Sequence, residues 1–165
     1  MRGVTSLRAV ATDHDRLVLG RLWQLYAHDL SEFRGALPDA GGLFRAGRLP
    51  TYLTDPDRAC HLVVHRDAVA GFGLVRGLAA GPRVLGEFFV VRAVRRAGVG
   101  AAAARLLLEA YPGRWEVAFQ EANAGAARFW RRVAADVVGE GWQEEPRPVP
   151  DKPDEPPDTW LSLTV

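Results

Sequence analysis

The chain has 165 residues, of which 48% are hydrophobic and 25% charged, and its formal net charge is +1 at pH 7. These proportions are typical of one globular domain over residues 1–165, and the small net charge excludes a global field that would recruit nucleic acid or an anionic membrane. Cys60 is the only cysteine, so an internal disulfide is impossible. With no signal-peptide or membrane-spanning pattern, this favours a cytoplasmic protein, as a monomer or homodimer.

The first third of the chain predicts a strand, a long helix and a loop. Residues 4–11 are predicted as a strand, and Thr12 or Asp13 can cap the helix that follows over about 14–33. Glycine and proline interrupt residues 34–50, which we expect to be a loop with room for a helical turn. The apolar residues of the helix recur at steps of three or four, at Leu22, Leu25, Tyr26, Leu30 and Phe33.

The remaining elements alternate between strands and helices. Strands are predicted at 60–65, 68–78, 82–91, 114–119 and 159–165, with a tight turn at 66–68, and helices at 98–110 and 123–135. Residues 146–157 are rich in proline and are expected to form a surface loop. The order predicts an α/β fold built on one mixed sheet.

A glycine-rich turn, RRAGVG at 95–100, joins a strand-like segment to an Ala/Leu-rich helix. Unpaired amides at the start of that helix would attract an anion, and glycines would let a phosphate approach the backbone closely. Arg95, Arg96 and Arg92 add forked donors that suit phosphate oxygens. The alternative is that the glycines serve only close packing at the helix start.

Three phosphate-binding motifs compete for this turn. A P-loop is excluded, because no lysine and hydroxyl residue follow Gly100. Gly98, Gly100 and Ala103 match a dinucleotide fingerprint, with Glu121 as its distant acid, but six residues separate the strand from the first glycine and too few strand–helix units follow. The third motif, R/Q-x-x-G-x-G/A, is matched by Arg95, Gly98 and Gly100.

With its flanks over 84–134, this third motif resembles the GCN5-related N-acetyltransferase (GNAT) superfamily, and the chain is similar to small bacterial members. The resemblance implies a central mixed sheet of about six to seven strands with helices on both faces. It implies that acetyl-coenzyme A lies where strand 82–91 parts from 114–119, with backbone groups of Phe89, Val90 and Val91 facing the pantetheine arm. The pyrophosphate loop would consist of Arg95, Arg96, Ala97, Gly98, Val99, Gly100 and Ala101.

The same resemblance extends to the helix that starts near Asn123. The family motif N-x-x-A-x-x-x-Y is matched by Asn123 and Ala126, but Trp130 stands in place of the tyrosine. Asn123 is either a plain helix cap or also a ligand of the cofactor arm. An indole N–H cannot deliver a proton usefully, so the general acid is unassigned. Phe129 and Trp130 are expected to contact the cofactor or the core.

Glu87, in the middle of a strand that looks buried, is the candidate general base. A buried carboxylate is costly unless it is paired or faces a polar cavity, so Glu87 is either a base of raised pKa or half of a structural ion pair. Tyr26 and Asp29 share a helix face, which either borders the acceptor pocket, as the resemblance implies, or is simply solvated. No metal site is expected, since His61 and His65 lack a third ligand.

These observations favour an acetyl-CoA-dependent N-acetyltransferase that transfers the acetyl group directly to a primary amine. Two other functions stay open. The missing tyrosine is consistent with a catalytically degenerate protein that senses acyl-CoA, and the dinucleotide fingerprint is consistent with a nicotinamide-dependent oxidoreductase. The acceptor, whether a small molecule or a protein amine, is not specified by the sequence.

Overall fold

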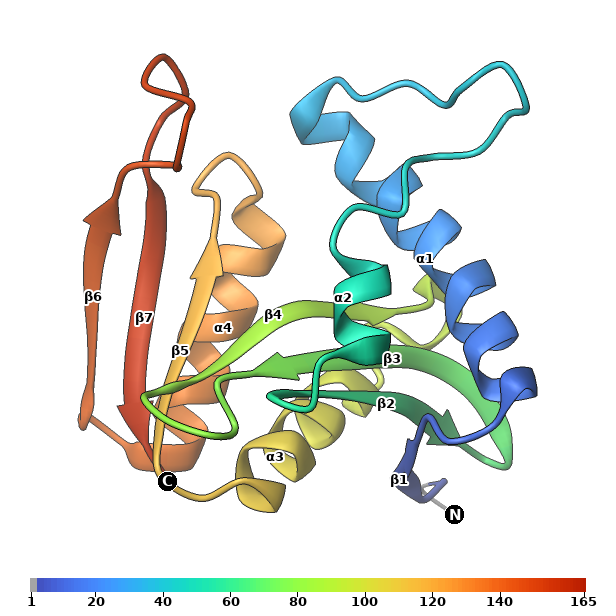
Figure 1. The fold of residues 1–165 in the computed structure, drawn as a ribbon. Helices are drawn as coiled ribbons and strands as arrows, with labels where there is room; N and C mark the ends of the chain where they lie inside the picture. Colours follow the sequence, from blue (N-terminus) through green and yellow to red (C-terminus); the bar gives the residue numbers. More distant parts are fainter. Residues whose placement is uncertain (1–2) are drawn as a thin grey trace.

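The computed structural model describes residues 3–165, which form a seven-stranded sheet in the order β1-β2-β3-β4-β5-β7-β6 (Figure 1). The fold class expected from the element order is therefore confirmed. The strands are β1 (Thr5–Ala9), β2 (Arg58–His65), β3 (Ala68–Arg76), β4 (Arg83–Val90), β5 (Arg114–Phe119), β6 (Trp142–Arg147) and β7 (Asp158–Thr164). The helices are α1 (Asp13–Arg34), α2 (Leu49–Thr54), the short 3-10 turn η1 (Arg92–Val94), α3 (Val99–Ala110) and α4 (Ala124–Val138).

The strands pair antiparallel except at β4 and β5, which are parallel and are connected through α3. A dinucleotide fold needs an open sheet of several parallel strands, wound by helices on both faces. In residues 3–165 a single parallel pair is present, so the scaffold that the oxidoreductase alternative requires is missing. The tight turn before β3 is also as expected, since Arg66 and Asp67 both adopt the left-handed conformation that two-residue hairpin turns use.

Helices cover both faces of the sheet. On one face, Leu19 and Trp23 of α1 and Tyr52 of α2 pack with Leu62 and Phe72 of the sheet. On the other face lies a second core, in which side chains of α3 and α4 meet those of β5 and β7. Figure 1 shows α1 and α2 over β2, β3 and β4, whereas α4 lies behind β5 and β7. On the side of the sheet where α1 and α2 lie, β5 and β7 are therefore not covered by a helix of residues 3–165 (Figure 1).

Helix α1 is close to its predicted length, and Leu22 and Tyr26 of its apolar residues pack in the core, but two others do not. Thr12 caps it, and a capping box with Asp15 closes its first turn. Leu25 and Phe33, which the spacing predicted as core residues, are 51% and 37% exposed. That part of the prediction is wrong because the helix turns Trp23 toward the sheet, where its indole N–H also donates to the Arg45 carbonyl.

Two other boundaries differ from the prediction. The helical turn allowed within 34–50 lies later, as α2, and the proline-rich segment starts later, because Pro146 and Arg147 pair with β7 as part of β6. Proline is tolerated there because β6 is an edge strand. Among the described residues, no helix combines the length and the apolar character that crossing a membrane requires.

Strand β4 contains the feature that shapes the site. It pairs with β5 only over Arg83–Leu85, although it continues to Val90. At the same place Glu87 lies opposite Leu74 and Leu85 opposite Val75, which leaves Gly86 as an extra residue. Such a β-bulge bends and twists its strand. The resemblance implied that β4 parts from β5. The bulge coincides with the point where this happens.

Candidate active site

The N-terminus of α3 is an open row of backbone donors. Gly98, at the N-cap, has a left-handed φ of 81°, no side chain caps the helix, and no acidic residue lies in its first turn. The first backbone bond runs from the Ala102 amide to the Gly98 carbonyl, so within residues 3–165 the amides of Val99, Gly100 and Ala101 have no acceptor. A Cβ on Gly98 would meet open space. The turn therefore has the donors and the room that a diphosphate needs.

Asp29 of α1 holds Arg95 of the predicted phosphate loop and Arg92, which lies just before that loop. Nη2 of Arg92 lies 2.9 Å from Oδ1 of Asp29, and Arg95 pairs with Oδ2. Burial acts to raise the pKa of Asp29, but the hydrogen bonds from Arg95 and Arg92 outweigh it and keep that pKa below its usual value. The carboxylate of Asp29, which was expected to border the acceptor pocket, is thus paired with these two arginines.

The backbone of β4 offers a second set of polar groups. The Val91 amide donates to the Ala70 carbonyl at 2.8 Å, and hydrogen-bonding directions alternate along an antiparallel strand. Phe89 therefore faces β3 as Val91 does, while Phe88 and Val90 face the parted side. Nε of Arg95 donates to the Val90 carbonyl at 2.8 Å. Of the three residues whose backbone groups were expected to face a pantetheine arm, Phe89 and Val91 face β3, whereas Val90 faces the parted side together with Phe88.

An aromatic cluster of Phe88, Phe129 and Trp130 lies beside the parted strands. The Phe88 ring stacks on Phe129 with centroids 5.8 Å apart and meets the edge of Trp130 at 5.2 Å. Trp130 is only 7% exposed, so it is mainly a core residue. Phe129 also packs on α3, since a Cβ on Gly100 would come within 3.3 Å of its ring. These contacts fix the spacing between α3 and α4 beside the gap.

Asn123 caps α4. Its side-chain Oδ1 accepts from the Ala126 amide at 3.1 Å, which is the plain capping role. Its amide nitrogen is not used in that bond.

Glu87 lies on the α1 side of β4 and accepts a hydrogen bond from the Tyr26 hydroxyl. Burial raises the pKa of Glu87, while the Tyr26 bond and the charges of Arg34, Arg48 and Arg76 act to lower it. Within residues 3–165 no cation lies at ion-pairing distance from this carboxylate, so the ion-pair alternative is not what the structure contains. Tyr26 lies in the core with Trp23 and Phe72 and reaches the site through its hydroxyl.

Tyr52 is a site residue that the sequence did not reveal. Its hydroxyl lies against Gly86, in the space that a Cβ at the bulge would occupy. Burial raises the pKa of Tyr52, and the neighbouring Glu87 raises it further, so the phenol stays protonated. The only available signal was weak, since Tyr52 falls in a short segment beyond the predicted loop.

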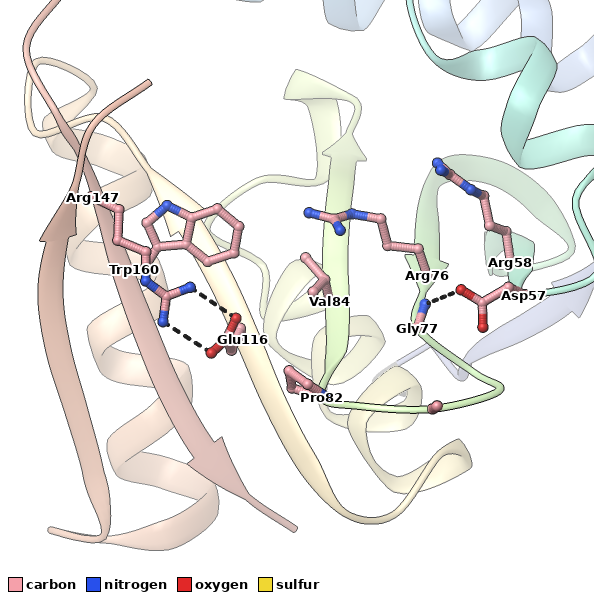
Figure 2. A pocket seen from close by; sticks show the side chains of 10 residues that line it. Asp57, Arg58, Arg76, Gly77, Pro82, Val84, Glu116, Arg147 and Trp160 are labelled. Carbon is pink, nitrogen blue, oxygen red and sulfur yellow. Dashed lines mark hydrogen bonds and ion pairs between the residues drawn. The ribbon is translucent and has the colours of Figure 1, made fainter. Parts of the chain in front are cut away.

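A cavity of about 430 Å³ opens on the same face of the sheet as α1 and α2, beside the part that these helices cover (Figure 2). It runs from β2 across β3, β4 and β5 to β6 and β7. Its lining consists of Asp57, Arg58, Arg76, Gly77, Ala80, Pro82, Val84, Glu116, Arg147 and Trp160. Val84 is on the same strand as Glu87 and just before the bulge. Along β4, the cavity therefore lies before the bulge and the phosphate turn lies after the end of the strand.

Other residues singled out in the sequence lie apart from this site. Nε2 of His61 lies 2.7 Å from the Tyr111 hydroxyl, and Nδ1 of His65 lies 3.0 Å from the Thr5 hydroxyl. Burial raises the pKa of the Cys60 thiol to about 11. Glu121, the acid of the dinucleotide fingerprint, is bonded by Arg131 and Thr159.

Comparison with protein families gives one match over most of the chain. The sequence profile of the acetyltransferase (GNAT) family matches residues 22–134, which include the second half of α1, the bulge, the phosphate turn and most of α4. A comparison with curated proteins matches none of them.

Solved structures of low sequence identity share the fold. An acetyltransferase from Thermus thermophilus superposes with a TM-score of 0.68 at 17% identity, covering 97% of each chain. An aminoglycoside acetyltransferase in complex with coenzyme A gives 0.68 at 16% identity, covering 98% of this chain and 95% of its own. A histone acetyltransferase and related acetyltransferase from Corynebacterium glutamicum gives 0.68 at 16%, covering 100% and 98%.

Proposed function

The chain belongs to the GNAT acetyltransferase family, and from that premise we propose that it transfers an acetyl group from acetyl-CoA directly to a primary amine. One observation carries the proposal: a buried carboxylate lies where β4 parts from β5, and an open helix N-terminus follows the far end of the same strand. The first suits proton removal and the second suits a diphosphate. Together they suit a thioester donor and an amine acceptor that meet at the bulge.

The donor side uses groups that are already in place. The free amides of Val99, Gly100 and Ala101, with the charge of Arg95 and Arg96, would hold the diphosphate. The outward-facing backbone of Val90 and Phe88 would bond the amide groups of the pantetheine arm, as an added strand does. Acetyl-CoA supplies the acetyl group in activated form, as a thioester.

Glu87 is proposed as the general base. A primary amine is mostly protonated at neutral pH, so a proton must leave before the nitrogen can attack a thioester. A carboxylate whose pKa is raised by burial is a stronger base than one in water, and the Tyr26 hydroxyl holds it in one orientation. Tyr52 is the proposed proton donor to the departing thiolate, in the role for which Trp130 is unsuited.

Substitution of Glu87 tests this function. Glu87→Gln keeps the size of the side chain and an acceptor for the Tyr26 hydroxyl, but it cannot accept a proton. We expect kcat to fall about 10²- to 10⁴-fold, with acetyl-CoA affinity unchanged in isothermal titration calorimetry. An unchanged kcat would remove Glu87 from the mechanism.

The stability of the same variant provides an internal control. Because the pKa of Glu87 is raised in the folded state, its ionised form opposes folding. That penalty sets in as the pH rises through the unfolded-state pKa and is complete above the folded-state pKa. Glu87→Gln should therefore melt at an equal or higher temperature than the wild type at pH 7. A large drop would mean that any loss of activity reflects unfolding.

A sensor that binds acyl-CoA without turnover is the competing function, and Trp130 is the observation that favours it. A panel of amines assayed with acetyl-CoA separates the two. Binding of acetyl-CoA with Glu87-dependent turnover supports the transferase, whereas binding with no acetylation of any amine supports the sensor.

A further inference from the structure

Arg76 lines the 430 Å³ cavity and forms no ion pair with another described residue. Its Nε is buried and has no hydrogen-bond partner among residues 3–165, and no carboxylate in that part of the chain lies within ion-pairing distance of its guanidinium. Figure 2 shows the guanidinium projecting from β3 over the cavity toward Trp160. Arg76 is only half-buried, and its charge acts on the pKa values of Glu87 and Glu116 without forming an ion pair with either. A buried polar atom is normally hydrogen-bonded, so the guanidinium of Arg76 is available to a bound anion.

The acidic residues of the cavity are already used. Both oxygens of Glu116 accept from Arg147 at 3.0 Å (Figure 2). Asp57 accepts from the backbone amides of Gly77, at 3.2 Å, and Ala79, at 2.6 Å, and so holds the turn after β3. Neither carboxylate forms an ion pair with Arg76 among residues 3–165.

The separation of Arg76 and Glu87 indicates the size of an acceptor that could reach both residues. Glu87 lies opposite Leu74, and Arg76 follows Leu74 by two residues, so Arg76 and Glu87 are neighbours on one face of adjacent strands. Two residues along a strand span about 7 Å, which is the scale of a small molecule. An amine at Glu87 and an anion at Arg76 would thus belong to one small molecule.

We propose that the acceptor is an amine that also carries a carboxylate, such as an amino acid, with Arg76 binding the carboxylate while Glu87 faces the amine. This inference rests on the proposed function. A guanidinium binds a carboxylate through two parallel hydrogen bonds, and one such group balances a single negative charge. Trp160 and Val84 form the apolar part of the wall, beside which an uncharged side chain can lie.

Matched acceptors test the proposal. The twenty amino acids are assayed against their carboxamides, which keep the amine and the shape but lose the negative charge, and spermidine represents polycationic amines. We expect kcat/KM to be at least tenfold higher for the best amino acid than for its carboxamide. Equal rates for the two, or a preference for spermidine, would overturn the proposal. So would a preference for 2-aminoethyl phosphate over every amino acid.

Substitution of Arg76 assigns the preference to the residue. Arg76→Met should reduce the ratio between acid and carboxamide to within about twofold. Arg83→Met is the matched control, because Arg83 is the neighbour of Val84 on β4 and points to the opposite face, so it should keep the ratio. A role limited to the electrostatic environment of Glu87 would lower both rates together and leave the ratio intact, which would contradict the proposal.

The outcomes separate this proposal from the function on which it rests. Acetylation of amines that carry no carboxylate, but of no amino acid, would contradict the carboxylate site and support the transferase. If no amine is acetylated, the transferase fails, and the site is judged by the quenching of tryptophan fluorescence, to which Trp160 and four other tryptophans contribute. Quenching by an amino acid but not by its carboxamide, lost in Arg76→Met, supports the site, and its absence overturns it.

Discussion

At the scale of single residues, the site depends on carboxylates whose partners lie far along the chain. Glu87 bonds Tyr26, 61 residues away, and Asp29 bonds Arg92 and Arg95, 63 and 66 residues away. The sequence identified Glu87, Tyr26 and Asp29 as candidates from burial and helix spacing. It could not pair them, because contacts over such separations depend on how α1 is placed on the sheet.

The Tyr26–Glu87 bond makes a prediction about pH dependence. The bond favours the ionised form of Glu87, so it lowers a pKa that burial raises. Tyr26→Phe removes the hydroxyl and should raise that pKa further. Since the base acts in its ionised form, the acidic limb of the kcat/KM profile should move to higher pH. A limb that stays in place, or moves to lower pH, would show that Tyr26 does not tune Glu87.

Asp29 makes a prediction about cofactor affinity. Its carboxylate competes with a diphosphate for Arg92 and Arg95, both of which are partly exposed. Asp29→Asn should therefore tighten coenzyme A binding by up to about fivefold, the value of roughly 1 kcal/mol for one exposed pair. Binding should also become more sensitive to salt. Titration calorimetry at two ionic strengths measures both effects.

The control for Asp29 is Glu32→Gln, an exposed residue on the same helix, which should leave the affinity unchanged. Weaker binding by Asp29→Asn would mean that the carboxylate positions the arginines rather than competing for them.

At the scale of elements, the bulge in β4 is the decisive feature. It was not predicted: the strand was recognised over 82–91, but a glycine inside a strand pattern can mark several irregularities. The parting of β4 from β5 was expected only through the family resemblance. What places the bulge is the match between Gly86, which has no side chain, and the Tyr52 hydroxyl that occupies the space. Tyr52 belongs to a short helix that the sequence predicted as no more than a turn.

A double-mutant cycle tests this fit. Gly86→Ala places a Cβ on the Tyr52 hydroxyl and should destabilise the fold by about 1–3 kcal/mol, as overpacking does. Tyr52→Phe removes the overlapping oxygen and should recover part of that loss in the double variant, measured by urea unfolding. Additive effects would show that the two residues do not share the space.

Gly20→Ala is the matched control for an added Cβ. Nothing lies within 4 Å of that position, in the middle of α1. Alanine should therefore stabilise the helix there by about 0.5–1 kcal/mol.

At the scale of the molecule, the proposed site combines the phosphate turn and the cavity, on either side of the bulge in β4. The phosphate turn could be predicted from the sequence, because it is a local motif within 84–134. The cavity could not be predicted, because it gathers residues from six strands, β2 to β7, and no stretch of the chain contains their pattern. Arg76 and Trp160 line the same cavity only because of the strand order, which places β7 beside β5.

A crystal structure with coenzyme A at saturating concentration tests the central claim most directly. The account predicts the diphosphate on the amides of Val99–Ala101 and the pantetheine arm along Val90, with its thiol at the bulge near Glu87. Coenzyme A bound elsewhere, with the N-terminus of α3 left open to solvent, would contradict it.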